Sequence, residues 1–197
     1  MRAPIAAFLL LLLATPAFAR PGFPPGWSAS GRQQDYEFGT DAIPGTTGKQ
    51  AAYVKALPRA ETNAFGGMLQ CIKADNYLGQ RVRLAARLKG VGASAIQLWM
   101  RVDGPRPDNY GIAPMLAFYN NSDRRITGTT DWQRAEVVLD VPKNSAAICY
   151  GFFLAGGKGE AWADGLSLSK VGQDVPVSRM AVPFPTPTEP ANLAFDR

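Results

Sequence analysis

Short segments in which apolar and polar residues alternate recur along most of the chain. The clearest is residues 81–89, where the apolar residues share one parity: Val82, Leu84, Ala86 and Leu88. Such alternation is typical of a β-strand with one buried and one solvent-facing side. Eight further segments show a weaker form of the pattern: residues 36–38, 50–56, 68–74, 95–102, 114–120, 132–141, 147–155 and 161–171.

Clusters of Gly, Pro, Asn and Asp separate these segments, and no stretch after residue 20 keeps a 3.6-residue apolar period over three turns. Evenly spaced short strands around one core predict an all-β fold, a β-sandwich over residues 20–172. Residues 173–190 are rich in proline, which predicts an extended linker rather than another core element.

The first 19 residues have the three parts of a secretory signal peptide. A basic start at Met1 and Arg2 precedes an apolar run over residues 5–13, and Ala17-Phe18-Ala19 matches a cleavage site. The run is shorter than the roughly 20 residues that span a bilayer, so an uncleaved anchor is the weaker interpretation. We therefore expect a periplasmic or secreted protein.

The composition excludes several kinds of catalytic site. The chain contains no histidine, which rules out Ser-His-Asp and Cys-His catalysis and histidine-ligated zinc or haem. Its formal net charge is +5, but the basic residues are scattered with no run of five or six. That distribution favours a solvated surface over a nucleic-acid partner.

Several motifs occur in an order that resembles the galactose-binding-like jelly rolls of carbohydrate-binding modules. They are Pro24-Pro25-Gly26-Trp27, Gly48-Lys49-Gln50-Ala51, Gly128-Thr129-Thr130-Asp131-Trp132-Gln133 and Ala161-Trp162-Ala163-Asp164-Gly165-Leu166. Residues 99–104, Trp-Met-Arg-Val-Asp-Gly, are similar to uncharacterised jelly-roll domains fused to some bacterial transcription regulators. The resemblance implies a two-sheet antiparallel jelly-roll β-sandwich. It implies this fold more strongly than any ligand, because one fold serves many functions.

The resemblance also implies a first strand that the N-terminus has no room for. That strand reads Asn-x-x-Phe-Glu in the family, and the chain ends in a similar Asn192-Leu193-Ala194-Phe195-Asp196-Arg197. One hypothesis is that residues 191–197 return as the missing strand, either within one chain or by exchange in a homodimer. The alternative is a disordered tail.

The two cysteines favour a disulfide in an exported protein. In an eight-stranded jelly roll, the strands that hold Cys71 and Cys149 are neighbours in one sheet. Apolar alternation places both side chains on the outer face of that sheet, where paired Cβ atoms can meet the spacing of a disulfide. Two unpaired thiols are the alternative.

We expect a ligand-binding face on the same sheet. Residues 95–102 bury their even-numbered side chains, and the following strand is predicted to bury Leu116 and Phe118. An aromatic ring beside amides and a paired Arg and Asp suits a sugar, which offers an apolar ring face and many hydroxyls. The predicted site residues are Gln97, Trp99, Arg101, Asp103, Tyr119, Asn121, Lys73 and Phe153. Alternatively, a loop such as residues 105–112 covers Trp99, and Arg101 and Asp103 form an ordinary surface pair.

The family resemblance also implies a structural calcium ion between the first and last strands. Asp164 matches the acid of the last strand, and Asp196 would match that of the first if the tail docks; carbonyls near Gly48 and Lys49 would complete the shell. The second acid expected after Asp164 is Gly165 here.

No pair of carboxylates is placed for glycoside hydrolysis, which needs two across a cleft. We therefore expect a non-catalytic module that binds a carbohydrate or envelope glycan. The alternatives are a structural or protein-interaction module that dimerises through its C-terminal strand, and a weak lyase or hydrolase dependent on Asp103.

Overall fold

The computed structural model describes residues 23–107, 111–179 and 188–194. Its strands are β1 (Ser28–Gly31), β2 (Tyr36–Asp41), β3 (Ala51–Ala56), β4 (Phe65–Lys73), β5 (Arg81–Asp103), β6 (Met115–Tyr119), β7 (Ile126–Asp140), β8 (Ala147–Ala155) and β9 (Glu160–Val171). Three 3-10 turns are η1 (Gln33–Asp35), η2 (Asp75–Tyr77) and η3 (Ser122–Arg124). The predicted all-β fold is confirmed. Across these described ranges, no helix has the length and apolar character needed to cross a membrane.

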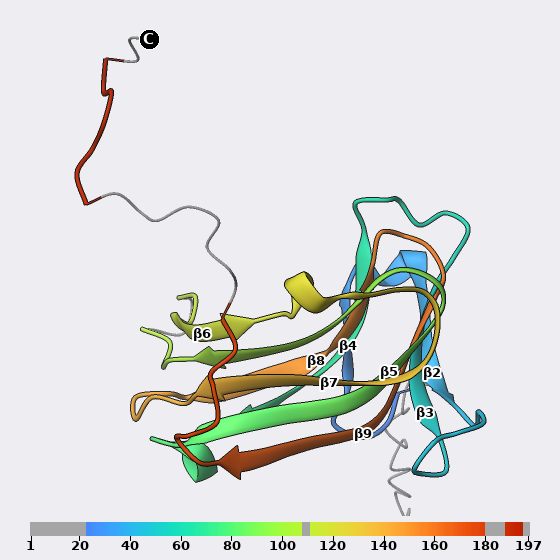
Figure 1. Ribbon diagram of the computed structural model, residues 1–197, viewed down its shortest axis with the longest axis horizontal. Helices are drawn as coiled ribbons and strands as arrows, with labels where there is room; N and C mark the ends of the chain where they lie inside the picture. Colours follow the sequence, from blue (N-terminus) through green and yellow to red (C-terminus); the bar gives the residue numbers. More distant parts are fainter. Residues whose placement is uncertain (1–22, 108–110, 180–187, 195–197) are drawn as a thin grey trace, which may run out of the picture.

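The strands form two antiparallel layers that share β5 (Figure 1). The first layer has the order β1-β4-β8-β5-β6, and it uses the second half of β5. The second layer has the order β7-β5-β9-β3-β2, and it uses the first half of β5. Figure 1 shows β5 and β7 curving around one side of the molecule to join the layers. This arrangement is the predicted jelly-roll sandwich.

The sequence pattern predicts two strands where the structure has one. Residues 81–89 and 95–102 belong to the single 23-residue strand β5. The segment between them bends instead of turning back, because β7 stays paired with it at Gly90 and Ala93 through shifts in register. Glycine permits the bend: Gly92 has a φ of +56°, which side chains disfavour.

The core lies between the layers and comes from alternate residues, as the sequence predicts. On β5 it comprises Val82, Leu84, Ala86, Leu88, Ile96, Leu98, Met100 and Val102, and the facing set on β8 is Ile148, Tyr150, Phe152 and Leu154. All of these are buried. The odd-numbered residues of β8 and of the two regular parts of β5, residues 81–89 and 95–103, therefore point to the outer faces, whereas Ala93 in the bend is buried in the core.

The beginning of the predicted linker is attached to the sandwich. Val177 packs against the core, and the amide of Ser178 donates to the carbonyl of Val138 on β7 at 2.8 Å. The Arg81 guanidinium also donates to the carbonyls of Gln173 and Val175. Residues 173–178 thus cover part of the open edge of β7.

The two ends of the chain are only partly described. The predicted signal peptide, residues 1–19, lies outside the described residues, as do Phe195 and Asp196. Residues 188–194 contain no strand and are exposed. The docking of residues 191–197 as a strand stays a prediction.

Candidate functional site

The outer face of the first layer is an ordered grid of side chains, because the strands pair without a break in register along β4, β8 and most of this half of β5. One row crosses the sheet through Arg101, Cys149 and Cys71. The next row contains Trp99, Gly151 and Leu69. A Cβ atom at Gly151 would collide with the carbonyl oxygen of Met68, so glycine at this position allows the backbones of β4 and β8 to approach closely.

A cleft of about 370 Å³ occupies this face. Its lining residues come from all five strands of this layer and from the residue that follows β6. They are Ser30, Phe65, Leu69, Cys71, Trp99, Arg101, Phe118, Asn120, Cys149 and Phe153. The lining is mainly apolar and includes four aromatic side chains. An apolar hollow with a few polar groups is the usual form of a small-molecule site.

The aromatic residues of the cleft are available to a ligand. Phe65 and Phe118 are 44% and 40% exposed, and Trp99 and Phe153 are half-buried. The Phe65 and Phe153 rings make an edge contact, with centroids 5.6 Å apart. Exposed aromatic rings that face a common hollow lose water contact when a ligand enters, which favours binding.

Arg101 is held in a fixed orientation by Asp103. Its Nε and Nη2 atoms lie 3.0 and 2.9 Å from Oδ2 of Asp103. The Asp103 side chain is 7% exposed, whereas that of Arg101 is 45% exposed. The carboxylate therefore anchors one edge of the guanidinium and leaves the other edge toward solvent.

The predicted disulfide between Cys71 and Cys149 is confirmed, and it lies in the cleft. The two cysteines are direct cross-strand partners on β4 and β8, with an S–S distance of 2.05 Å. Both cysteines line the cleft, and Cys71 is exposed. The bridge thus joins two strands and also contributes an apolar surface to the site.

The structure brings three of the predicted site residues into the cleft: Trp99, Arg101 and Phe153. Asp103 acts on the cleft through Arg101. Lys73 and Gln97 lie on the same face but outside the lining: Lys73 is at one end of the grid, and Gln97 is the cross-strand partner of Phe153. Of the loop proposed to cover Trp99, the described residues 105–107 and 111–112 do not line the cleft.

The prediction for the strand at residues 114–120 is wrong. Tyr119 pairs with Met100 and is 1% exposed in the core, whereas Phe118 pairs with Arg101 on the outer face. Asn121 is also buried, and its Oδ1 atom accepts the backbone N–H of Leu98. Residues 115–119 are apolar or aromatic at every position, so alternation could not determine which set faces the core.

Sequence reasoning missed four contributors to the cleft apart from the cysteines and Phe118: Ser30, Phe65, Leu69 and Asn120. Leu69 had a usable signal, because it shares the parity of Cys71 on β4. Phe65 precedes the predicted start of its strand, and Ser30 belongs to β1, which the sequence did not predict. Their positions follow from strand pairing and not from local pattern.

The surroundings of Asp164 do not fit the predicted calcium site. Its Oδ2 atom accepts hydrogen bonds from the amide and hydroxyl of Thr47 at 2.8 and 2.9 Å, and the Arg87 guanidinium lies 3.3 Å away. Oδ2 of Asp164 thus already accepts hydrogen bonds from three donors, and Arg87 supplies the positive charge that a calcium ion would otherwise provide. The second predicted ligand, Asp196, lies outside the described residues, so the prediction stays untested.

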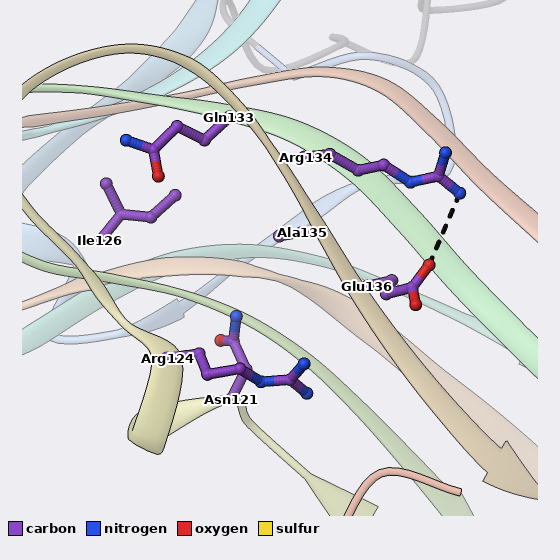
Figure 2. Close-up of a pocket in the computed structure, with 7 residues that line it drawn as sticks. All are labelled: Asn121, Arg124, Ile126, Gln133, Arg134, Ala135 and Glu136. Atoms are coloured by element: carbon purple, nitrogen blue, oxygen red, sulfur yellow. Dashed lines mark ion pairs between the residues drawn. The ribbon is translucent and has the colours of Figure 1, made fainter. Parts of the chain in front are cut away.

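A second hollow, of about 580 Å³, lies beside β7 (Figure 2). Its lining is mainly polar and contains no aromatic residue: Asn121, Arg124, Ile126, Gln133, Arg134, Ala135 and Glu136. The carboxylate of Glu136 lies 3.5 Å from Arg134 and 3.5 Å from Arg83. Because its only carboxylate is paired with Arg134 and its lining has no aromatic residue among those described, this hollow is a weaker candidate than the aromatic cleft.

The chain is similar in sequence to a bacterial protein. The chain is 39% identical over 173 residues to a protein of Bacillus subtilis strain 168 described as the uncharacterized HTH-type transcriptional regulator YbfP. The match covers 87% of this chain and 56% of the regulator, so the chain spans about half the length of this curated relative. No family model matches the sequence.

Solved structures with the same architecture include carbohydrate-binding modules. A xylan-binding domain of family 22 aligns with a TM-score of 0.51 and 12% identity, covering 78% of this chain and 92% of that domain. A family 30 carbohydrate-binding module gives a TM-score of 0.51 with 14% identity, covering 73% and 91%. The fold is that of the jelly-roll carbohydrate-binding modules. At these identities the likeness concerns the fold alone.

Proposed function

We propose that this protein binds a carbohydrate in the aromatic cleft, without transforming it. The observation that carries the proposal is the convergence of Phe65, Trp99, Phe118 and Phe153 on one hollow that also holds Arg101. The apolar face of a pyranose ring suits stacking on these rings. Arg101, Asn120 and Ser30 provide polar groups that fix the orientation of its hydroxyls.

The charge distribution supports binding without catalysis. Among the described residues, no carboxylate lines the cleft. Asp103, the neighbouring acid, is committed to Arg101 through two contacts of about 3 Å. Hydrolysis of a glycosidic bond requires a pair of carboxylates on opposite sides of the scissile bond.

The comparisons support the proposal from two directions. The xylan-binding domain and the family 30 module share the fold, and their descriptions name carbohydrate or xylan binding. The B. subtilis relative is described as a transcription regulator, and this chain matches about half of it. A jelly-roll domain in that half of a regulator is consistent with recognition of a ligand.

The test is binding of a panel of plant and bacterial envelope glycans, measured by calorimetry and by the shift in melting temperature. Ligands that bind the native state raise that temperature, and the rise grows with the logarithm of their concentration above Kd. Trp99→Ala and Phe118→Ala should each weaken binding about tenfold or more. The matched control is Trp132→Ala, because Trp132 lies in the other layer and its Nε1 atom donates to the carbonyl of Pro44.

Two outcomes would contradict this function. No binding across the panel would do so, and so would loss of binding in Trp132→Ala with none in Trp99→Ala. The latter result would move the ligand to the opposite face of the sandwich.

We infer that the protein acts outside the cytoplasm. The predicted signal peptide and the Cys71–Cys149 disulfide support this location, because disulfides persist mainly in oxidising compartments. Mass spectrometry of the protein from its native host should find an N-terminus at Arg20. A cytoplasmic protein that retains residues 1–19 would contradict the inference.

A second candidate function is self-association through the C-terminal segment. Leu193 is 76% exposed in a segment that forms no strand within one chain, so an apolar side chain there has no burial. Light scattering of the full chain and of a chain ending at residue 179 tests this function. A dimer that becomes monomeric on truncation supports it, and a monomer in both cases removes it.

A further inference from the structure

The cleft has a single charged lining residue among those the structure describes, and that residue is Arg101. The contacts of its guanidinium are one-sided: Nε and Nη2 face Oδ2 of Asp103, while Nη1 has no partner within the described part of the chain. An arginine that is oriented on one edge and open on the other is preorganised for a second hydrogen-bonding group.

The charge on this face favours an anion. The outward-facing residues of the five strands include two cations, Arg101 and Lys73, and one acid, Asp103. Lys73 is exposed and lies in the row of Asp103, two strands away, which corresponds to roughly 10 Å at the usual strand spacing. A negatively charged ligand would therefore meet a net positive field at this end of the cleft.

Aromatic surface lies directly beside the open edge of Arg101. Phe118 on β6 is the cross-strand partner of Arg101, and Trp99 lies two residues before Arg101 on the same face of β5. Cβ atoms of such neighbours lie about 4.5–5.5 Å apart across strands. A sugar ring stacked on these side chains would carry its exocyclic group within reach of the guanidinium.

We propose that the cleft selects glycans that carry a carboxylate, namely uronic acid residues, and that Arg101 is the residue that reads this group. The inference rests on the proposed carbohydrate-binding function and names the class of carbohydrate that binds. Charge-assisted hydrogen bonds are roughly twice as strong as neutral ones. Because the cleft offers few other polar groups, this one contact dominates its choice of ligand.

The experiment compares a matched pair of ligands by calorimetry: an oligogalacturonide and the same oligomer with its carboxyl groups methyl-esterified. The ring and its hydroxyls are identical, so the difference in affinity measures recognition of the charge. The acid should bind at least tenfold more tightly than the ester. This advantage should shrink as salt rises from 20 to 500 mM, since screening weakens exposed charge interactions. A neutral xylo-oligosaccharide completes the set.

Arg101→Gln should remove the preference for the acid, so that the acid and its ester bind this variant with equal affinity. Lys73→Gln should reduce the preference less, because Lys73 lies outside the cleft lining. The control is Arg134→Gln, an exposed arginine of β7 that lies in the other layer and pairs with Glu136. Urea unfolding and thiol quantification of each variant ensure that the fold and the disulfide are intact.

The two proposals fail in different ways. Equal binding of acid and ester, or a preference that survives in Arg101→Gln, overturns the role of Arg101 but leaves carbohydrate binding in place. Binding of a free carboxylate such as acetate as tightly as the oligomer would also overturn it, because the ring would then contribute nothing. If no saccharide in the set or the wider panel binds, both proposals fall.

Discussion

The side chain of Asn121 accepts the backbone N–H of Leu98, with Oδ1 2.9 Å from the nitrogen. This bond joins the turn after β6 to the middle of β5, where Leu98 is completely buried. Asn121 also adopts a left-handed backbone, with a φ of +38°. The turn therefore fixes where β6 ends, and with it which side chains of β6 reach the cleft.

Replacing Asn121 should destabilise the protein in a manner that separates these two roles. Asn121→Ala leaves the Leu98 N–H buried without a partner and also strains the backbone, so we expect a loss of about 2–4 kcal/mol in the free energy of unfolding. Asn121→Gly loses the bond but relieves the strain, and it should cost about 1 kcal/mol less. Urea unfolding measures both, and equal stability of the two variants would contradict the role of the left-handed backbone.

The disulfide should contribute strongly to stability because it closes a long loop. Cys71 and Cys149 are 78 residues apart, for which the chain-entropy model gives about 4 kcal/mol. The double variant Cys71→Ser/Cys149→Ser should melt about 8–16 °C lower than the native protein. Native protein reduced with a phosphine serves as the control and should match the variant. A shift below 3 °C would show that the bridge does little for folding.

Arg81 should hold the segment that follows β9 against the sandwich. Its side chain pairs with Asp140 at 2.7 and 3.0 Å and donates to the carbonyls of Gln173 and Val175 at 2.7 Å each. Arg81→Gln should accelerate amide hydrogen exchange at Ser178 and Val138, which share a hydrogen bond at the edge of β7. Exchange in β8 should stay unchanged and is the internal control. Unaltered protection at Ser178 would show that the segment is held by other contacts, such as the packing of Val177.

The Tyr53 hydroxyl should remain protonated at pH values above 10.0, the ordinary pKa of a tyrosine. Burial and the hydrogen bond that its hydroxyl donates to Glu37 at 2.8 Å raise the pKa of Tyr53 from 10.0 to about 12. The folded state thus holds this proton more tightly than the unfolded state, so the associated stability is complete below pH 10 and is lost as pH rises toward 12.

The measurement for Tyr53 is the absorbance at 295 nm of native protein minus that of Tyr53→Phe. The difference should be absent at pH 10.5 in the folded state and should appear when urea unfolds the protein at the same pH. A midpoint near 10 in the folded protein would contradict the assigned environment.

Several features of the site could be predicted from the sequence because they depend on alternation within one strand. The parity of residues 95–102 correctly places Trp99 and Arg101 outside and their neighbours in the core, because every even-numbered residue there is a large apolar one and the polar residues are all odd-numbered. The same argument fails at β6, where both parities are apolar and a bulge shifts the register between Val102 and Asp103. In that strand only pairing with β5 decides that Phe118 faces the cleft.

The sequence by itself determines the β-sandwich and its alternating core, since both follow from the two-residue period of a strand. The resemblance to jelly rolls adds that Cys71 and Cys149 lie on neighbouring strands. Only the tertiary structure decides that β5 is one bent strand and that Phe65, Phe118 and Ser30 join Trp99 around a cleft. These residues come from strands far apart in the chain. Their convergence depends on register and bulges, which are set by packing between strands and leave no signal within any one of them.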